Sequence, residues 1–117
     1  MFRREGMAEE SFEERRRARR YPVRLAVTVF ASGLAGPGVR GHTVDVSALG
    51  MRLVTEQDLV RGVDQTVMLD APGEPIVAKA LLVWTEARGE RWAHGLMLRG
   101  LGASDAARLA RLLSERV

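Results

Sequence analysis

The chain has 117 residues, of which 46% are hydrophobic and 28% are charged, and this composition predicts a single globular domain with one core. It contains no cysteine and only two histidines, which excludes disulfides, thiolate metal sites and cysteine nucleophiles and leaves little for a histidine-based metal centre or general base. No segment approaches the roughly 18 consecutive apolar residues of a membrane helix, and the first residues contain no apolar signal sequence, so we expect a cytoplasmic protein.

The N-terminal segment carries the entire excess of positive charge. Residues 1–24 hold eight Arg and five Glu, which accounts for the net charge of +3, whereas residues 25–117 are balanced. We expect a flexible extension over residues 1–14 and a folded domain over residues 15–117. A short solvated helix over residues 8–18, with Glu early and Arg late, is one interpretation of the charge pattern. The near absence of Lys suggests a binding role, because the planar guanidinium pairs bidentately with phosphate or a guanine edge.

Strands are predicted from Tyr21 onwards, where apolar and polar residues begin to alternate. The apolar positions of the first strand recur with a period of two and are Val23, Leu25, Val27 and Val29. A glycine-rich loop over residues 32–38 ends this strand. Further strands are expected at about residues 40–46, 50–54, 65–70, 76–84 and 91–98.

A helical period follows Gly102 and ends the chain. Ser104 is the predicted N-cap, and Asp105 lies in the first turn. The predicted apolar stripe consists of Ala106, Leu109, Ala110, Leu113 and Val117. Six short strands and one helix predict a mainly β fold, a six-stranded antiparallel split β-barrel with a C-terminal helix over an open mouth. An open meander sheet with a packed helix is the structural alternative.

Two short segments stand out as candidate binding elements. An arginine-rich segment lies directly before the first strand, and an Asp-x-Ser-x-x-Gly sequence lies at the turn between the second and third strands. Their defining residues are Arg16, Arg20, Asp45, Ser47 and Gly50. In this order, and at these places relative to the predicted strands, the two segments resemble those of the PilZ domain family, whose members are receptors for the bacterial second messenger cyclic di-GMP. The resemblance extends over about residues 14–116, because the last strands and the helix also fit the family.

The resemblance implies a function without catalysis. It predicts a cyclic di-GMP-binding effector or adaptor domain that orders its Arg-rich arm on binding and signals to a protein partner, with no cofactor and no metal. The expected ligand-binding residues are Arg15, Arg16, Arg20, Asp45, Ser47 and Gly50, with Arg17, Arg19 and Arg24 as adjuncts.

These residue types suit a compact dianion with two guanines. Arginine matches the paired O6 and N7 acceptors of guanine as well as the phosphates, and its plane stacks on the bases. Asp45 can accept from the guanine N1–H and N2–H₂ groups, which an arginine cannot serve. Ser47 can donate to a phosphate or a base. Gly50 is expected to allow a turn with positive φ and to leave room for the ligand near the backbone.

The register of the arginine segment has two solutions. Arg20-x-x-x-Arg24 fits the family pattern as well as Arg16-x-x-x-Arg20. We favour Arg16 and Arg20, because the Tyr-Pro-Val sequence directly after Arg20 matches the usual entry into the first strand. Arg24 is then expected on the outer face of that strand, near enough to assist.

Structural roles compete with each functional one. The arginine segment can be a solvated charge run, and Asp45 to Gly50 can be a hairpin corner only. His42 and His94 are expected on strands without a ligand role, and Trp84 and Trp92 are expected to pack rather than to stack on bases.

Competing functions rank lower. A PilZ-fold interaction scaffold that does not depend on the nucleotide is the alternative, although this chain keeps the motif residues. A nucleic-acid-binding barrel is disfavoured, because only Phe12 and Tyr21 among the aromatic residues lie near the arginines. An enzyme is disfavoured because we find no metal cluster, P-loop or Ser-His-Asp constellation.

Overall fold

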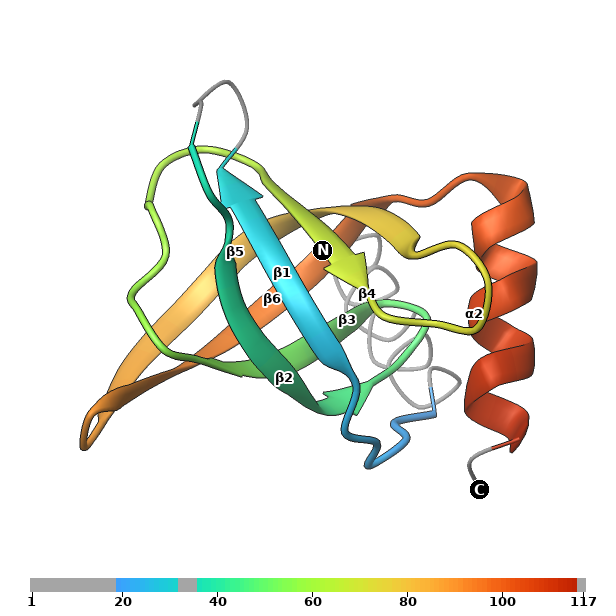
Figure 1. Ribbon diagram of the computed structural model, residues 1–117, viewed down its shortest axis with the longest axis horizontal. Helices are drawn as coiled ribbons and strands as arrows, with labels where there is room; N and C mark the ends of the chain where they lie inside the picture. Colours follow the sequence, from blue (N-terminus) through green and yellow to red (C-terminus); the bar gives the residue numbers. More distant parts are fainter. Residues whose placement is uncertain (1–18, 32–35, 116–117) are drawn as a thin grey trace, which may run out of the picture.

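The six strands close into an antiparallel barrel. The computed structural model describes residues 19–31 and 36–115, in which the strand order around the barrel is β1-β2-β3-β6-β5-β4 (Figure 1). The elements are β1 (Ala26–Ala31), β2 (Val39–Val46), β3 (Gly50–Thr55), β4 (Gln65–Leu69), β5 (Ile76–Arg88), β6 (Arg91–Gly100) and α2 (Ala103–Glu115). The predicted barrel is confirmed and the open sheet is wrong, because β1 pairs with β4 as well as with β2.

The hydrophobic core lies inside the barrel and consists of every second side chain along the strands. Val27, Val29, Val67 and Leu69 on the paired strands β1 and β4 are all buried, as the period of two predicts. The helix α2 stands at one end of the barrel, beside the turn between β4 and β5 (Figure 1). Its buried leucines belong to the same core, so the helix covers that mouth as expected.

The first strand is shorter than predicted at its start. Val23 and Leu25 are buried as expected, but the regular strand begins only at Ala26. The preceding residues contact Thr43 through both backbone and side chain. Thr43 N donates to Leu25 O at 2.9 Å, and the Thr43 hydroxyl accepts from Leu25 N at 2.8 Å and donates to Val23 O. A β-bulge at Val44 shifts the register of β2 directly after this point and interrupts the regular ladder.

The helix begins two residues earlier than a cap at Ser104 allows. Ala106 N donates to Gly102 O at 2.8 Å, so Gly102 occupies the N-cap position and Ser104 lies in the first turn. The prediction of Ser104 as N-cap is therefore wrong. Glycine is accepted at this position in helices, whereas a sequence pattern favours serine.

The buried stripe of α2 is also rotated from the predicted one. Leu109 and Leu113 are buried as expected, but the third buried residue is Leu112, whereas Ala106 and Ala110 are exposed. The predicted Val117 lies outside the described residues. Polar contacts explain the rotation. Arg108 Nη2 donates to the carbonyls of Pro72 and Glu74, and Asp105 accepts from Val77 N at 3.3 Å, which turns this face of the helix toward β5.

The hairpin of β5 and β6 reaches beyond the other strands. β4 pairs with β5 only as far as Ala80, and residues 81–88 pair with β6 alone. A second register shift lies between Leu82 and Trp84. Trp84 is 40% exposed on the outer face, where its indole lies over Gly95, so it packs against the outside of the barrel wall and not in the core.

Candidate functional site

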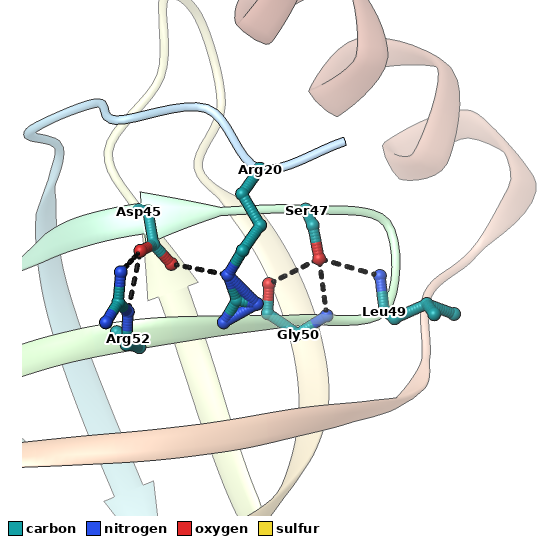
Figure 2. Close-up of polar contacts among 6 residues, drawn as sticks. All are labelled: Arg20, Asp45, Ser47, Leu49, Gly50 and Arg52. Carbon is teal, nitrogen blue, oxygen red and sulfur yellow. Dashed lines mark hydrogen bonds and ion pairs between the residues drawn. The ribbon is translucent and has the colours of Figure 1, made fainter. Parts of the chain in front are cut away.

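Asp45 is held at the end of β2 by two arginines. Its side chain is only 6% exposed, and its Oδ2 accepts from both Nε and Nη2 of Arg52, with the Nε distance at 2.6 Å. Arg20 approaches from the opposite side, with its Nε 3.5 Å from Asp45 Oδ1 (Figure 2). The hydrogen bond to this carboxylate raises the pKa of Arg52. The two predicted segments therefore meet at Asp45.

The bulge in β2 decides which way Asp45 points. Thr43 pairs with Leu53 on the inner face, and a regular ladder would place Asp45 on that same inner face opposite Met51. The extra residue at Val44 instead pairs Asp45 with Arg52 on the outer face. The carboxylate thus reaches the outer surface of the barrel.

One oxygen of Asp45 has no hydrogen bond within the described residues. Oδ1 is buried and receives no donor, since Arg20 Nε at 3.5 Å makes an ion pair without hydrogen-bond geometry. A buried acceptor without a donor costs about 1–3 kcal/mol, so such atoms call for an explanation. A ligand with an N–H group facing Oδ1 would supply the missing donor.

Ser47 shapes the corner that follows Asp45. Its Oγ accepts from Leu49 N at 3.2 Å and Gly50 N at 3.1 Å and donates to Gly50 O at 3.2 Å (Figure 2). The residue is 2% exposed. These contacts match the hairpin-corner interpretation of the motif. Direct donation from Ser47 to a ligand stays a prediction.

Gly50 serves the corner for a different reason than predicted. Its φ is not positive, so the expected left-handed turn is wrong. Gly50 pairs with Met97 on β6, and a Cβ at this position would lie 2.5 Å from Leu96 O. Because that oxygen belongs to the backbone of a neighbouring strand, only glycine fits here without displacing β6.

The arginine segment is described from Arg19 onwards. Arg19 lies over the ring of Tyr21, with its guanidinium carbon 5.8 Å from the ring centroid. Tyr21 and Val46 exchange backbone hydrogen bonds of 2.8 and 3.0 Å, which fastens this segment beside the end of β2. Arg24 lies further along, next to His42 in a surface hollow. The predicted residues Arg15, Arg16 and Arg17 lie outside the described residues.

Two features of this surface were not predicted from the sequence. Arg52 was missed, although the alternation in residues 50–55 already places it on the outer face of β3. An apolar surface also adjoins the site across β6, where Gly50 pairs with Met97 and Arg52 pairs with Gly95, over which Trp84 lies. Met97 is 48% exposed, so solvent-exposed apolar side chains lie next to Asp45 and Arg52.

His94 is a buried strand residue with both ring nitrogens engaged. Thr55 Oγ1 lies 2.8 Å from Nε2 and also donates to Gln57 O, so it accepts from a protonated Nε2. Nδ1 then accepts from Thr85 Oγ1 at 2.9 Å. Burial lowers the pKa of His94, and the neutral imidazole fits this arrangement.

The part of the chain that the structure describes offers neither a cluster of metal-ligating side chains nor a membrane-spanning helix. No group of three or more His, Cys, Asp or Glu side chains there is arranged to hold a metal ion. Over the same residues, no helix has the length and apolar character needed to cross a membrane.

Comparisons with known proteins identify relatives of the fold and of the sequence. The family model of the PilZ domain matches residues 14–115. The structure is similar to the Bacillus subtilis inhibitor of motility (MotI/DgrA), with a TM-score of 0.66 and 18% identity over 87% of this chain and 50% of that chain. It is also similar to the PilZ domain of CeSA from a cellulose-synthesizing bacterium, with a TM-score of 0.59 and 18% identity over 84% of this chain and 97% of that domain.

The two structural comparisons differ in how much of the similar protein this chain covers. The chain spans about half the length of MotI/DgrA, and at this identity the two structural likenesses show the fold alone. No curated protein sequence matches the chain.

Proposed function

The chain belongs to the PilZ domain family, and on this premise we propose that it binds cyclic di-GMP on the outer face of β2 and β3, between the arginine segment and Asp45. The protein acts as an effector or adaptor domain rather than as an enzyme. Ligand binding orders the arginine arm, and the ordered arm and the adjoining barrel surface present the signal to a protein partner.

Oδ1 of Asp45, which receives no hydrogen bond within the described residues, carries this proposal. Guanine presents N1–H and N2–H₂ side by side, and the lone pairs of Oδ1 can accept from this edge while Oδ2 keeps its hydrogen bonds from Arg52. Arg20 and Arg52 flank the same carboxylate, and Arg52 exposes about half of its side chain. Positive charge therefore surrounds a buried anionic acceptor, which suits a ligand that carries donor-bearing bases and two phosphates.

The corner residues support the ligand through the backbone. Ser47 holds the turn after Asp45, and Gly50 lets β3 and β6 approach closely. We expect the position of the Asp45 carboxylate to depend on both Ser47 and Gly50. If Ser47 also donates to the ligand, its hydroxyl must first release Gly50 O, because a hydroxyl has one proton to donate. Arg15 and Arg16, with Arg17, Arg19 and Arg24 as adjuncts, are proposed to clasp the phosphates and bases from the arm.

Titration calorimetry with cyclic di-GMP tests the proposal directly. We expect saturable binding by the unmodified chain and a loss of about tenfold or more in Asp45→Asn, because a hydrogen bond to a charged group contributes about 1.5–3 kcal/mol. Asp64→Asn is the matched control, since Asp64 pairs with Arg99 on the exposed surface away from the site. Circular dichroism of each variant confirms that the barrel is retained.

The outcomes separate the site from the family function. Absence of heat with tens of micromolar ligand contradicts nucleotide binding and favours the nucleotide-independent scaffold. Normal binding by both Asp45→Asn and Arg20→Ala contradicts the assigned site. Arg16→Ala and Arg24→Ala, compared in the same assay, decide the register, because only one of them completes the pair with Arg20.

A further inference from the structure

A basic hollow lies on the outer face of β1, β2 and β3, beside the proposed nucleotide site. Its volume is about 410 Å³, which is within the range of about 300–1,000 Å³ typical of small-molecule sites. The charged and titratable side chains that line it are Arg24, Arg40, His42, Glu56 and Arg91. Three guanidinium groups thus face one carboxylate.

Strand pairing explains why these side chains share one surface. His42 on β2 pairs with Ala26 on β1 and with Val54 on β3, and this row forms the floor of the hollow. Arg40 lies two residues before His42 and therefore faces the same side. Arg91 reaches the hollow from the start of β6, where the next residue pairs with Thr55. The small side chain of Ala26 leaves the floor open.

Within the described residues, Glu56 is the one carboxylate that lines the hollow, so it offsets the positive charge only in part. Arg24, Arg40 and Arg91 form no ion pair there. Six other arginines of the described chain do pair with carboxylates, and these are Arg20, Arg52, Arg61, Arg88, Arg99 and Arg108. Burial together with the charges of Arg24 and Arg91 lowers the pKa of His42. The imidazole is therefore neutral at pH 7 and can accept or donate one hydrogen bond.

We propose that this hollow is a second anion site, which binds a phosphate monoester or diphosphate group between Arg40, Arg91 and His42. The guanidinium fork matches phosphate oxygens bidentately, and two such forks from different strands can hold one phosphate from two sides. Arg40 and Arg91 belong to neither of the two motif segments, and the proposal does not require that the chain binds a cyclic dinucleotide.

The hollow is separated from Asp45 along β2. Asp45 lies three residues after His42, which corresponds to about 10 Å of strand, and the bulge at Val44 lies between them. Arg24 stands at the border, so it is left unchanged in the tests that distinguish the two sites.

Titration of the His42 imidazole by NMR, at constant ionic strength, reports an anion in the hollow. Pyrophosphate and inorganic phosphate are the probes, and His94 is an internal reference because it is fully buried. We expect pyrophosphate to raise the pKa of His42 saturably, because an anion offsets the charges that lower it. Arg40→Gln and Arg91→Gln should weaken pyrophosphate binding by about fivefold or more. Arg99→Gln is the matched control, since it removes the same charge outside the hollow and Arg99 does not affect the reference His94.

Three results would overturn this proposal. The first is an unchanged pKa of His42 at millimolar pyrophosphate. The second is an equal loss of affinity in Arg99→Gln and Arg91→Gln, which would indicate a non-specific effect of the net charge. The third is competition between saturating cyclic di-GMP and pyrophosphate, which would make the hollow part of the nucleotide site. A stronger response to pyrophosphate than to phosphate supports a diphosphate ligand, and the reverse supports a single phosphate group.

Discussion

At the scale of single residues, the site combines a carboxylate with one oxygen that receives no hydrogen bond within the described residues and a glycine that has no space for a side chain. Asp45 is kept on the outer face by a bulge, and Gly50 allows the neighbouring strand to approach. Both residues are therefore constrained by the backbone around them. Substitutions at Asp45 and at Gly50, made one at a time, can separate the role of each residue in folding from its role in binding.

Gly50→Ala should destabilise the fold. The new Cβ would meet Leu96 O at 2.5 Å, and a backbone oxygen within a paired strand cannot move away cheaply. We expect a loss of about 1–3 kcal/mol in the free energy of unfolding, measured by urea denaturation. Gly100→Ala is the control, because its Cβ would meet only Lys79 Cβ at 3.8 Å. Equal stability of the two variants would contradict the steric role of Gly50.

His94 should make the stability depend on pH. Its folded-state pKa is lowered from the ordinary value of 6.5, so the unfolded chain binds a proton more readily than the folded one. The stabilisation that the neutral His94 gives to the folded state is fully present above pH 6.5 and is lost as the pH falls below that value. We expect the free energy of unfolding to decrease between pH 6.5 and 5.5, and His94→Gln to reduce this slope.

His42 provides the comparison for that measurement. Its pKa is also lowered, so it contributes with the same sign. It is less buried than His94, so His42→Gln should retain the larger part of the slope. A slope that disappears in His42→Gln and persists in His94→Gln would contradict the assignment to the buried histidine.

At the scale of the elements, alternation and turn residues were sufficient to predict the six strands. Val27, Val29, Val67 and Leu69 face inward as their period requires, and the C-terminal helix closes the barrel as its apolar positions indicate. Closure itself was predictable only as one of two alternatives, since pairing of β1 with β4 joins segments distant in the sequence.

Bulges and polar side-chain contacts were not predictable in the same way. If β2 kept its regular alternation through Val44, Asp45 would face the core. The bulge at Val44 turns Asp45 toward Arg52 instead. The hydroxyl of Thr43 takes the place of a backbone acceptor for Leu25 N, which a hydropathy pattern cannot reveal. The orientation of α2 likewise depends on carbonyl oxygens that no residue type specifies.

Arg108 should anchor α2 to the turn between β4 and β5. It donates to the carbonyls of Pro72 and Glu74, while Asp105 accepts from Val77 N on the same side of the helix. We expect Arg108→Ala to lower the free energy of unfolding by about 1–2 kcal/mol in urea denaturation. Arg111→Ala, on the exposed face, should change it by less than about 0.5 kcal/mol. A smaller effect in Arg108→Ala than in Arg111→Ala would contradict the anchoring role.

At the scale of the whole molecule, topology brings the two parts of the site together. β1 and β2 are antiparallel neighbours, so the residues before β1 run beside the end of β2. Tyr21 accordingly pairs with Val46, and Arg20 lies next to Asp45. Separation of these segments on opposite sides of the barrel would have contradicted the proposed site. Their contact follows from the strand order and does not require a ligand.

The projecting part of the β5 and β6 hairpin has a consequence for association between copies. Residues 81–88 leave one side of β5 without a strand partner in the described chain, and such an edge can recruit a strand from another molecule. The bulge at Val83 and the charges of Glu86 and Arg88 oppose this recruitment. We expect Glu86→Thr with Arg88→Thr to form dimers or larger aggregates in light scattering, whereas Asp58→Thr with Arg61→Thr, which removes an ion pair elsewhere, stays monodisperse. We therefore expect two charges and one irregularity to oppose edge-to-edge pairing of this hairpin.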